Sequence, residues 1–169
     1  MASGWRTLDG PAGALMTQVD SSAVFQPGTC AFARYYDASS AATTYFGDFI
    51  YQKGVASMAA GKWAALNPDN HTVSLLADGH LGGVAVGVAA VVANKYGWFQ
   101  KSGKGIGLLA ASVADNAGLY TTATAGQAGA TASGQSEIIG ARAAAASGSS
   151  AANTDVELAH PVCGLSAGA

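Results

Sequence analysis

The chain has little charge and few large apolar side chains for its length. Charged residues make up 11% of its 169 residues, and the net charge is −2. Ordinary soluble domains are about 25% charged. Valine, leucine, isoleucine and phenylalanine together supply only 32 residues, against 38 alanines and 23 glycines. The low net charge argues against intrinsic disorder. A thin core beneath a weakly charged surface favours burial against partners.

The shortage of charge also excludes some partners. The eight lysines and arginines are scattered and form no basic stripe, so nucleic-acid binding is not expected. Lys95, Lys101 and Lys104 gather around one predicted hairpin, which is typical of a solvated turn. A membrane helix needs about 18 consecutive apolar residues. The nearest approach is the alanine-rich segment 84–93, so a membrane partner is not expected either.

Cysteine is scarce as well, and only Cys30 and Cys163 are present. The N-terminal sequence MASGWRTLDGP lacks the apolar stretch of a secretory signal. Two cysteines in a chain without such a signal are typical of free thiols. A disulfide between the two cysteines, joining the N-terminal segment to the last strand, stays open as an alternative.

Residues 1–30 are polar and rich in turn formers, and Pro11 and Pro27 interrupt any helix. We expect an extended arm with one short strand. Its apolar side chains are irregularly spaced and would have little to bury against unless the arm docked on a neighbouring molecule. The hypothetical capsid or oligomer interface of this arm consists of Trp5, Arg6, Leu8, Leu15, Met16, Val24 and Phe25.

Residues 31–169 are predicted to form a single β domain, with the strongest pattern over 71–162. Aromatic and β-branched residues in 31–37 and 43–52 predict a pair of strands. Segment 54–66 fits a short helix and a strand–turn–strand equally well. The sequence NPDN that follows it is a turn.

From residue 71 onward, turn signals recur about every 8 to 12 residues, the spacing of a sandwich or barrel. A turn is also expected at 102–105, after a strand that contains Trp98. We therefore predict an all-β fold, a small β-barrel or β-tulip-like sandwich with an extended N-terminal arm. The expected strands in this part are 71–76, 84–92, 98–100, 106–113, 119–123, 136–146 and 155–162.

Large aromatic side chains are the main candidates for contact. Trp98 is flanked by Tyr96 and Phe99, and core packing is expected for it. Trp5 lies on an arm with no evident core, so we expect it at an interface, where tryptophan and tyrosine dominate the binding energy. Tyr35 and its neighbour Tyr36, with Trp63, are the other large contact groups.

Few residues in the sequence suggest catalysis or metal binding. His71 and His80 each follow an aspartate by two residues, and a turn could bring such units together around a metal. Asp and Asn in these turns are better explained by backbone capping. A small metal-dependent or hydrolytic enzyme using His71, His80 and Asp78 stays open as the least favoured alternative.

Motifs of covalent or phosphate chemistry are missing. The sequence contains neither GxSxG nor SxxK, and the glycine-rich segment 103–107 lacks the spacing of a phosphate loop. Glu137 and Glu157 are the only glutamates, and both are expected to point outward from strands. We therefore predict that the protein is not an enzyme and has no catalytic, cofactor-binding or metal-binding residues.

Several short motifs resemble the head decoration, or capsid cement, proteins of tailed bacteriophages. Proteins of that kind carry a YGW-hydrophobic-Q strand before a turn, a YTTATAG hairpin, a GxA strand and an acidic, hydrophobic last strand. The matching pieces cover about half of the chain. They are LGGVAVG at 81–87, YGWFQ at 96–100, LYTTATAG at 119–126, IGAR at 139–142 and DVEL at 155–158.

The resemblance implies a β-barrel or β-tulip-like domain without enzymatic activity, cofactor or small-molecule substrate. It further implies a homotrimer made in the host cytoplasm that binds the major capsid protein on the outer surface of the virion. Our hypothesis is that residues 1–30 clamp adjacent capsid subunits while the barrel stabilises the lattice. The alternative is a tail, fibre or other virion structural protein, or a host-binding module. An exposed aromatic groove with ligand affinity would favour this alternative.

Overall fold

The structure, a computed structural model, describes residues 4–12, 14–36 and 44–166. Within these ranges the chain contains strands and turns and no helix, which confirms the all-β prediction. The strands are β1 (Gly4–Asp9), β2 (Val19–Asp20), β3 (Cys30–Tyr36), β4 (Thr44–Lys53), β5 (Trp63–Asn67), β6 (Thr72–Leu75), β7 (Gly82–Gly87), β8 (Tyr96–Gln100), β9 (Ser102–Leu109), β10 (Gly118–Thr121), β11 (Ala128–Gly129), β12 (Ser136–Ala143) and β13 (Ala152–Ser166).

Five strands close into a small barrel in the middle of the molecule. Strand β4 pairs with β8, β8 with β7, β7 with β5 and β5 with β6. Strand β6 then returns to β4 through the parallel pair Lys53–Thr72. Small and medium side chains fill the barrel together with one phenylalanine, because a five-stranded ring encloses little space. The buried cluster is Met58, Ala64, Val73, Ala85, Val91 and Phe99.

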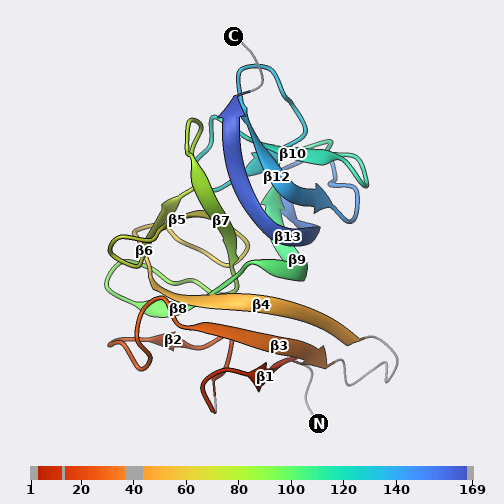
Figure 1. Cartoon of the computed structure of the whole chain (residues 1–169). Helices are drawn as coiled ribbons and strands as arrows, with labels where there is room; N and C mark the ends of the chain where they lie inside the picture. Colours follow the sequence, from red (N-terminus) through yellow and green to blue (C-terminus); the bar gives the residue numbers. More distant parts are fainter. Residues whose placement is uncertain (1–3, 13, 37–43, 167–169) are drawn as a thin grey trace.

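The N-terminal third covers one outer side of the barrel. Strands β3 and β4 form the predicted pair, β1 adds to β3, and β2 pairs with β8. Figure 1 shows β1, β3 and β4 stacked across one end of the molecule. Between this layer and the barrel lies a second buried cluster, with Trp5 and Phe25 packed against it. It consists of Ala14, Met16, Ala31, Ala33, Phe49, Tyr51 and Trp98.

This packing corrects the expectation that the apolar groups of residues 1–30 have little to bury against in their own chain. Met16 is only 1% exposed, and it lies in the same cluster as Phe49 and Tyr51. The hydroxyl of Tyr51 donates to Asp20 over 2.6 Å. The long outward face of β4 supplies the apolar surface, and the buried hydrogen bond ties the segment around β2 to it.

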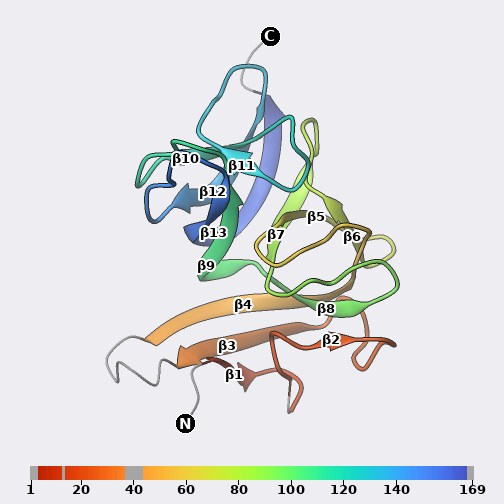
Figure 2. The same ribbon diagram turned by 180° about the vertical axis from the view of Figure 1, so that it is seen from behind.

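The C-terminal strands form a second circuit of pairing on another side of the barrel. Strand β9 pairs with β13, β13 with β12, β12 with β10, β10 with β11, and β11 with β9 again. Strand β13 also pairs with β7, which joins this circuit to the barrel. Figure 2 shows β10, β11 and β12 at the end of the molecule opposite β1 and β3. Trp63 and Val86, facing outward from the barrel, pack into the core of this C-terminal sheet.

The chain crosses from the barrel to the C-terminal sheet at Lys101. The turn predicted at 102–105 is wrong, since these residues begin β9 directly after β8 ends at Gln100. Gly103 has a φ of +84°, and a Cβ there would overlap the carbonyl oxygen of Phe46. The glycine therefore serves a close approach of two backbones and not a hairpin turn.

Other strand predictions differ mainly at their ends. Segment 54–66 is turns followed by β5, with Gly61 at a φ of +82°, so the helical interpretation is wrong. The strand predicted over 84–92 ends at Gly87, and the one over 136–146 ends at Ala143. Strand β13 extends beyond the predicted 155–162 at both ends because it pairs with β9, β12 and β7.

Candidate functional site

Three aromatic residues form a row across the N-terminal sheet. Trp5 of β1 lies directly opposite Tyr35 of β3, which lies opposite Tyr45 of β4. Residues paired in this way project from the same face of a sheet. The ring centroids of Trp5 and Tyr35 are 5.5 Å apart, and those of Tyr35 and Tyr45 are 6.3 Å apart. Trp5 also packs edge-on against buried Phe49, with 4.8 Å between centroids, and this contact fixes the row on the core.

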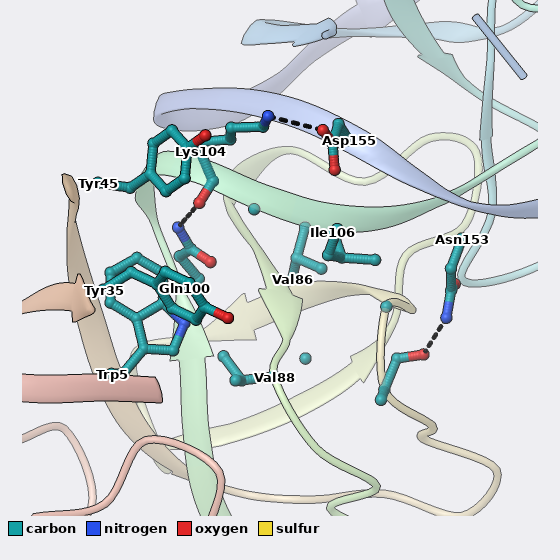
Figure 3. Close-up of a pocket in the computed structure, with 14 residues that line it drawn as sticks. Trp5, Tyr35, Tyr45, Val86, Val88, Gln100, Lys104, Ile106, Asn153 and Asp155 are labelled. Atoms are coloured by element: carbon teal, nitrogen blue, oxygen red, sulfur yellow. Dashed lines mark hydrogen bonds and ion pairs between the residues drawn. The ribbon is translucent and has the colours of Figure 1, made fainter. Parts of the chain in front are cut away.

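The aromatic row is one wall of a groove, and β9 and β13 of the C-terminal sheet form the other wall (Figure 3). The groove has a volume of about 430 Å³, within the size range of small-molecule sites. It is partly open to solvent. Besides the row, its lining consists of Ala60, Gly61, Val86, Gly87, Val88, Gln100, Lys104, Gly105, Ile106, Asn153 and Asp155.

An ion pair lies on the wall formed by β9 and β13. The Nζ atom of Lys104 lies 2.7 Å from a carboxylate oxygen of Asp155, and 5.0 Å from the centre of the Tyr45 ring. The hydrogen bond to Asp155 raises the pKa of Lys104. Both side chains are about one-third exposed, so the pair adds little stability. Its main consequence is that the cation and the carboxylate cancel each other in the groove.

Two amide side chains are held in place beside this pair. The Nε2 group of Gln100 donates to the carbonyl oxygens of Ser102 and Lys104, each over 2.9 Å. Asn153 donates from Nδ2 to the carbonyl oxygen of Ala60 over 3.3 Å. The amide nitrogens thus fix the two side chains to the backbone, and the amide oxygens keep their capacity as acceptors.

The opposite face of the same three strands has a different character. Arg6, Arg34 and Phe46 alternate with the aromatic row along β1, β3 and β4, and therefore point outward. Phe46 stacks on Phe32, with ring centroids 5.7 Å apart and the rings nearly parallel at 7°. These two side chains remain 47% and 37% exposed. We call Arg6, Leu8, Phe32, Arg34, Tyr36 and Phe46 the outer face.

Cationic and aromatic groups are interleaved on the outer face. The guanidinium of Arg6 lies 5.2 Å from the centre of the Tyr36 ring. Leu8 is half exposed at a register shift of β1 against β3. Aromatic residues and arginine are enriched in protein–protein interfaces, and exposed apolar patches of this kind mark binding surfaces. Strand β1 also has a sheet neighbour on one side only within the described chain, and such edges invite pairing.

The residues predicted to form one interface within 1–30 lie in different parts of the structure. Arg6 and Leu8 belong to the outer face, whereas Trp5 lies in the aromatic row. Met16 is buried inside the monomer and cannot contact a partner in this conformation. The remaining predicted residues lie on the loops around β2. Leu15 and Val24 are exposed there, and Phe25 packs on Tyr51 and Trp98 with centroid distances of 5.3 and 5.7 Å.

Two of the three side chains considered for metal chemistry, Asp78 and His80, have other contacts. Asp78 accepts hydrogen bonds from the Thr121 hydroxyl and from both the backbone NH and the hydroxyl of Ser136, at 2.8 to 2.9 Å. These bonds lower the pKa of Asp78 and tie the loop before β7 to β10 and β12. A ring nitrogen of His80 lies 3.3 Å from the carbonyl oxygen of Gly83. The described residues contain no group of three or more potential metal ligands.

The remaining candidates are the cysteines and glutamates. Cys30 and Cys163 are both free thiols, so the alternative of a disulfide between them is not realised. Cys163 is buried, and burial raises the pKa of its thiol to about 11. Glu137 and Glu157 are exposed on β12 and β13, as predicted.

Most of the residues that line the groove could not be predicted from the sequence. The sequence indicates that Tyr35 is a large contact group, but its alignment with Trp5 and Tyr45 depends on the strand register. The sequence pattern places Lys104 in a solvated turn. Asn153 and Asp155 lie more than a hundred residues from the aromatic row, and only the fold brings them together. The one available signal was the concentration of tyrosines in the predicted strand pair.

The chain matches no known protein-family model and none of the curated proteins with which it was compared. No helix in the described part of the chain could cross a membrane. The fold and the two surfaces therefore define the class: a small all-β domain with an aromatic-lined groove on one side of its N-terminal sheet and an exposed aromatic and cationic patch on the other.

Proposed function

We propose that this protein is a non-enzymatic structural protein of a tailed-phage virion. In this proposal it binds as a homotrimer to the outer surface of the icosahedral capsid and stabilises the lattice of the major capsid protein. The proposal rests on the sequence motifs that resemble capsid cement proteins. It is supported by the small all-β fold and, above all, by the outer face, where a stacked Phe32–Phe46 pair remains exposed beside two arginines.

Burial of this pair on a partner is the physical reason for docking. Covering exposed aromatic rings gains about 25 cal/mol for each Å² of apolar surface removed from water. Arg6 and Arg34 would meet acidic or carbonyl groups of the partner, which fixes orientation. A single small face gives a weak contact, but three copies in one trimer engage a symmetric site together, and their affinities reinforce one another.

Docking through the outer face changes the hypothesis about residues 1–30. Because Met16 and Phe25 pack on the N-terminal layer, deleting this segment would uncover Phe49, Tyr51 and Trp98 and disturb the fold. Loss of binding after such a deletion would not identify an interface. Substitutions on the exposed outer face are the cleaner test, since surface changes usually alter stability by less than about 0.5 kcal/mol.

We expect Phe32→Ser combined with Phe46→Ser to reduce co-sedimentation with expanded, undecorated capsids by at least about tenfold, as loss of an interface anchor does. The matched control is Ile139→Ser, which removes a similarly exposed apolar side chain from the C-terminal sheet. Equal capsid occupancy by the double variant and the control would contradict docking through the outer face.

The alternative of a tail, fibre or host-binding module keeps one specific observation in its favour. It calls for an exposed aromatic groove with ligand affinity, and a groove lined by Trp5, Tyr35 and Tyr45 is present. A virion protein can dock through one surface and bind a host molecule through another. Which molecule the groove suits is therefore a separate question.

A further inference from the structure

We propose that the groove between the N-terminal sheet and strands β9 and β13 binds a neutral saccharide. The apolar face of a sugar ring would lie against the Trp5–Tyr35 part of the aromatic row, and its hydroxyl groups would bond to the polar wall. This inference does not depend on capsid docking, because the groove and the outer face use opposite sides of the same strands.

The aromatic row supplies the first half of the recognition. Aromatic rings carry negative potential on their faces and attract groups with positive edges, such as the C–H bonds on one face of a pyranose. The three rings are already positioned by their mutual contacts and by Phe49. A ligand therefore orders few side chains when it binds, and this lowers the entropic cost of association.

The polar wall supplies the second half. Asp155, Asn153 and Gln100 present oxygen acceptors, and Lys104 presents a donor. The backbone hydrogen bonds of the two amides fix their orientation. A purely apolar ligand would remove these groups from water without replacing their hydrogen bonds, at a cost in free energy. A ligand with several hydroxyl groups can satisfy both walls at once.

Charge decides between a saccharide and ionic ligands. Among the described residues, the charged side chains that line the groove are those of Lys104 and Asp155, and they neutralise each other at 2.7 Å. A phosphate or sulfate group would need to break this pair and would then face Asp155. A cationic ligand would compete with Lys104, which already occupies the Tyr45 ring face. The groove chemistry thus favours a ligand without net charge.

Tyr35 and Tyr36 provide a matched pair of variants to test the site. They are adjacent residues of the same type on β3, and Tyr35 faces the groove while Tyr36 lies under Arg6 on the outer face. On β13, Asp155→Asn removes a proposed acceptor charge, and Glu157→Gln removes a carboxylate that does not line the groove.

The experiment is a titration of the isotope-labelled protein with maltotetraose, cellotetraose, galactotetraose and fully N-acetylated chitotetraose, followed by ¹H–¹⁵N NMR. We expect at least one of these neutral probes to shift the indole signal of Trp5, while those of the buried Trp63 and Trp98 stay in place. Tyr35→Leu should weaken this binding by about tenfold or more. Tyr36→Leu and Glu157→Gln should leave it within about twofold of the original.

Three results would overturn the inference. The first is that none of the four probes shifts the Trp5 indole signal at millimolar concentration. The second is that Tyr35→Leu and Tyr36→Leu weaken binding equally while both variants keep the native NMR spectrum. The third is that a phosphorylated probe, glucose 6-phosphate, binds more tightly than every neutral probe. None of these results bears on capsid docking, which uses the other face.

Discussion

The cores at the two ends of the molecule contain different kinds of side chain. Thirteen of the fourteen aromatic residues precede residue 101, and Tyr120 alone follows it. The cluster between the N-terminal layer and the barrel therefore contains large rings such as Phe49 and Trp98. Apart from Trp63, which reaches it from the barrel, the C-terminal sheet packs around aliphatic side chains and alanines, for example Leu109, Ile138 and Ala143.

The comparison shows where each kind of residue is needed. Large rings fill the wide space between the N-terminal layer and the barrel, and they continue past the core as the aromatic row. Small residues let the strands of the C-terminal sheet and the barrel approach closely. The two ends should thus respond in opposite ways to changes of side-chain size. The N-terminal layer is sensitive to lost volume, and the C-terminal sheet to added volume.

Truncation of a ring in the N-terminal layer should have the largest effect. Trp98 is buried and contacts Phe25 and Tyr51. We expect Trp98→Ala to lower the free energy of unfolding by about 3–5 kcal/mol, because it removes buried apolar area and leaves a cavity. Urea denaturation followed by circular dichroism measures this loss. A loss below about 1 kcal/mol would show that the large rings do not hold this end together.

Enlargement of an alanine in the C-terminal sheet should have the next largest effect. Ala143 is fully buried where β12 meets the turn at residue 117. Ala143→Leu adds volume that the close-packed strands cannot accept, and we expect a loss of about 1–3 kcal/mol. The control Ala159→Leu, at an exposed position of β13, should change stability by less than about 0.5 kcal/mol. If both variants are equally stable, the core of this sheet is loosely packed.

A rise in pH should have the smallest of the three effects, a loss of stability in the N-terminal layer. Burial, followed by the hydrogen bond to Asp20, raises the pKa of Tyr51 to about 12. Because the usual tyrosine pKa is about 10, the folded state favours the neutral phenol. The stability that the neutral Tyr51 phenol gives to the folded state is fully present below pH 10 and is lost as the pH rises toward 12. Near-ultraviolet circular dichroism should show the aromatic layer loosening in this range.

Tyr51→Phe is the variant that tests this assignment. It cannot ionise, so the loss of stability between pH 10 and 12 should become shallower, although its stability at neutral pH falls because Asp20 loses a donor. An unchanged alkaline transition in this variant would assign the transition to another group.

The parts of the fold that depend on local chemistry could be predicted. The strand pair β3–β4 follows from aromatic and β-branched residues, the turn after β5 from NPDN, and the barrel class from the spacing of turn signals. The crossing at Lys101 could not be predicted in this way. Its glycines resemble a turn in composition, whereas Gly103 is required by the close approach to the backbone of Phe46.

The candidate sites depend on contacts between distant segments. The sequence does not indicate that Trp5 packs against a core, because its partner Phe49 lies 44 residues further along the chain. The division between groove and outer face follows from the register of β1, β3 and β4, which tertiary packing sets. Lys104 and Asp155 meet only because β9 and β13 pair.

Cryo-electron microscopy of expanded, undecorated capsids mixed with the purified protein tests the central claim most directly. We expect ordered trimeric density at the local threefold positions, with β1, β3 and β4 turned toward the capsid and the groove open to solvent. Empty threefold positions at saturating protein would contradict the proposed function, and density in which the outer face points into solvent would contradict the assigned docking surface.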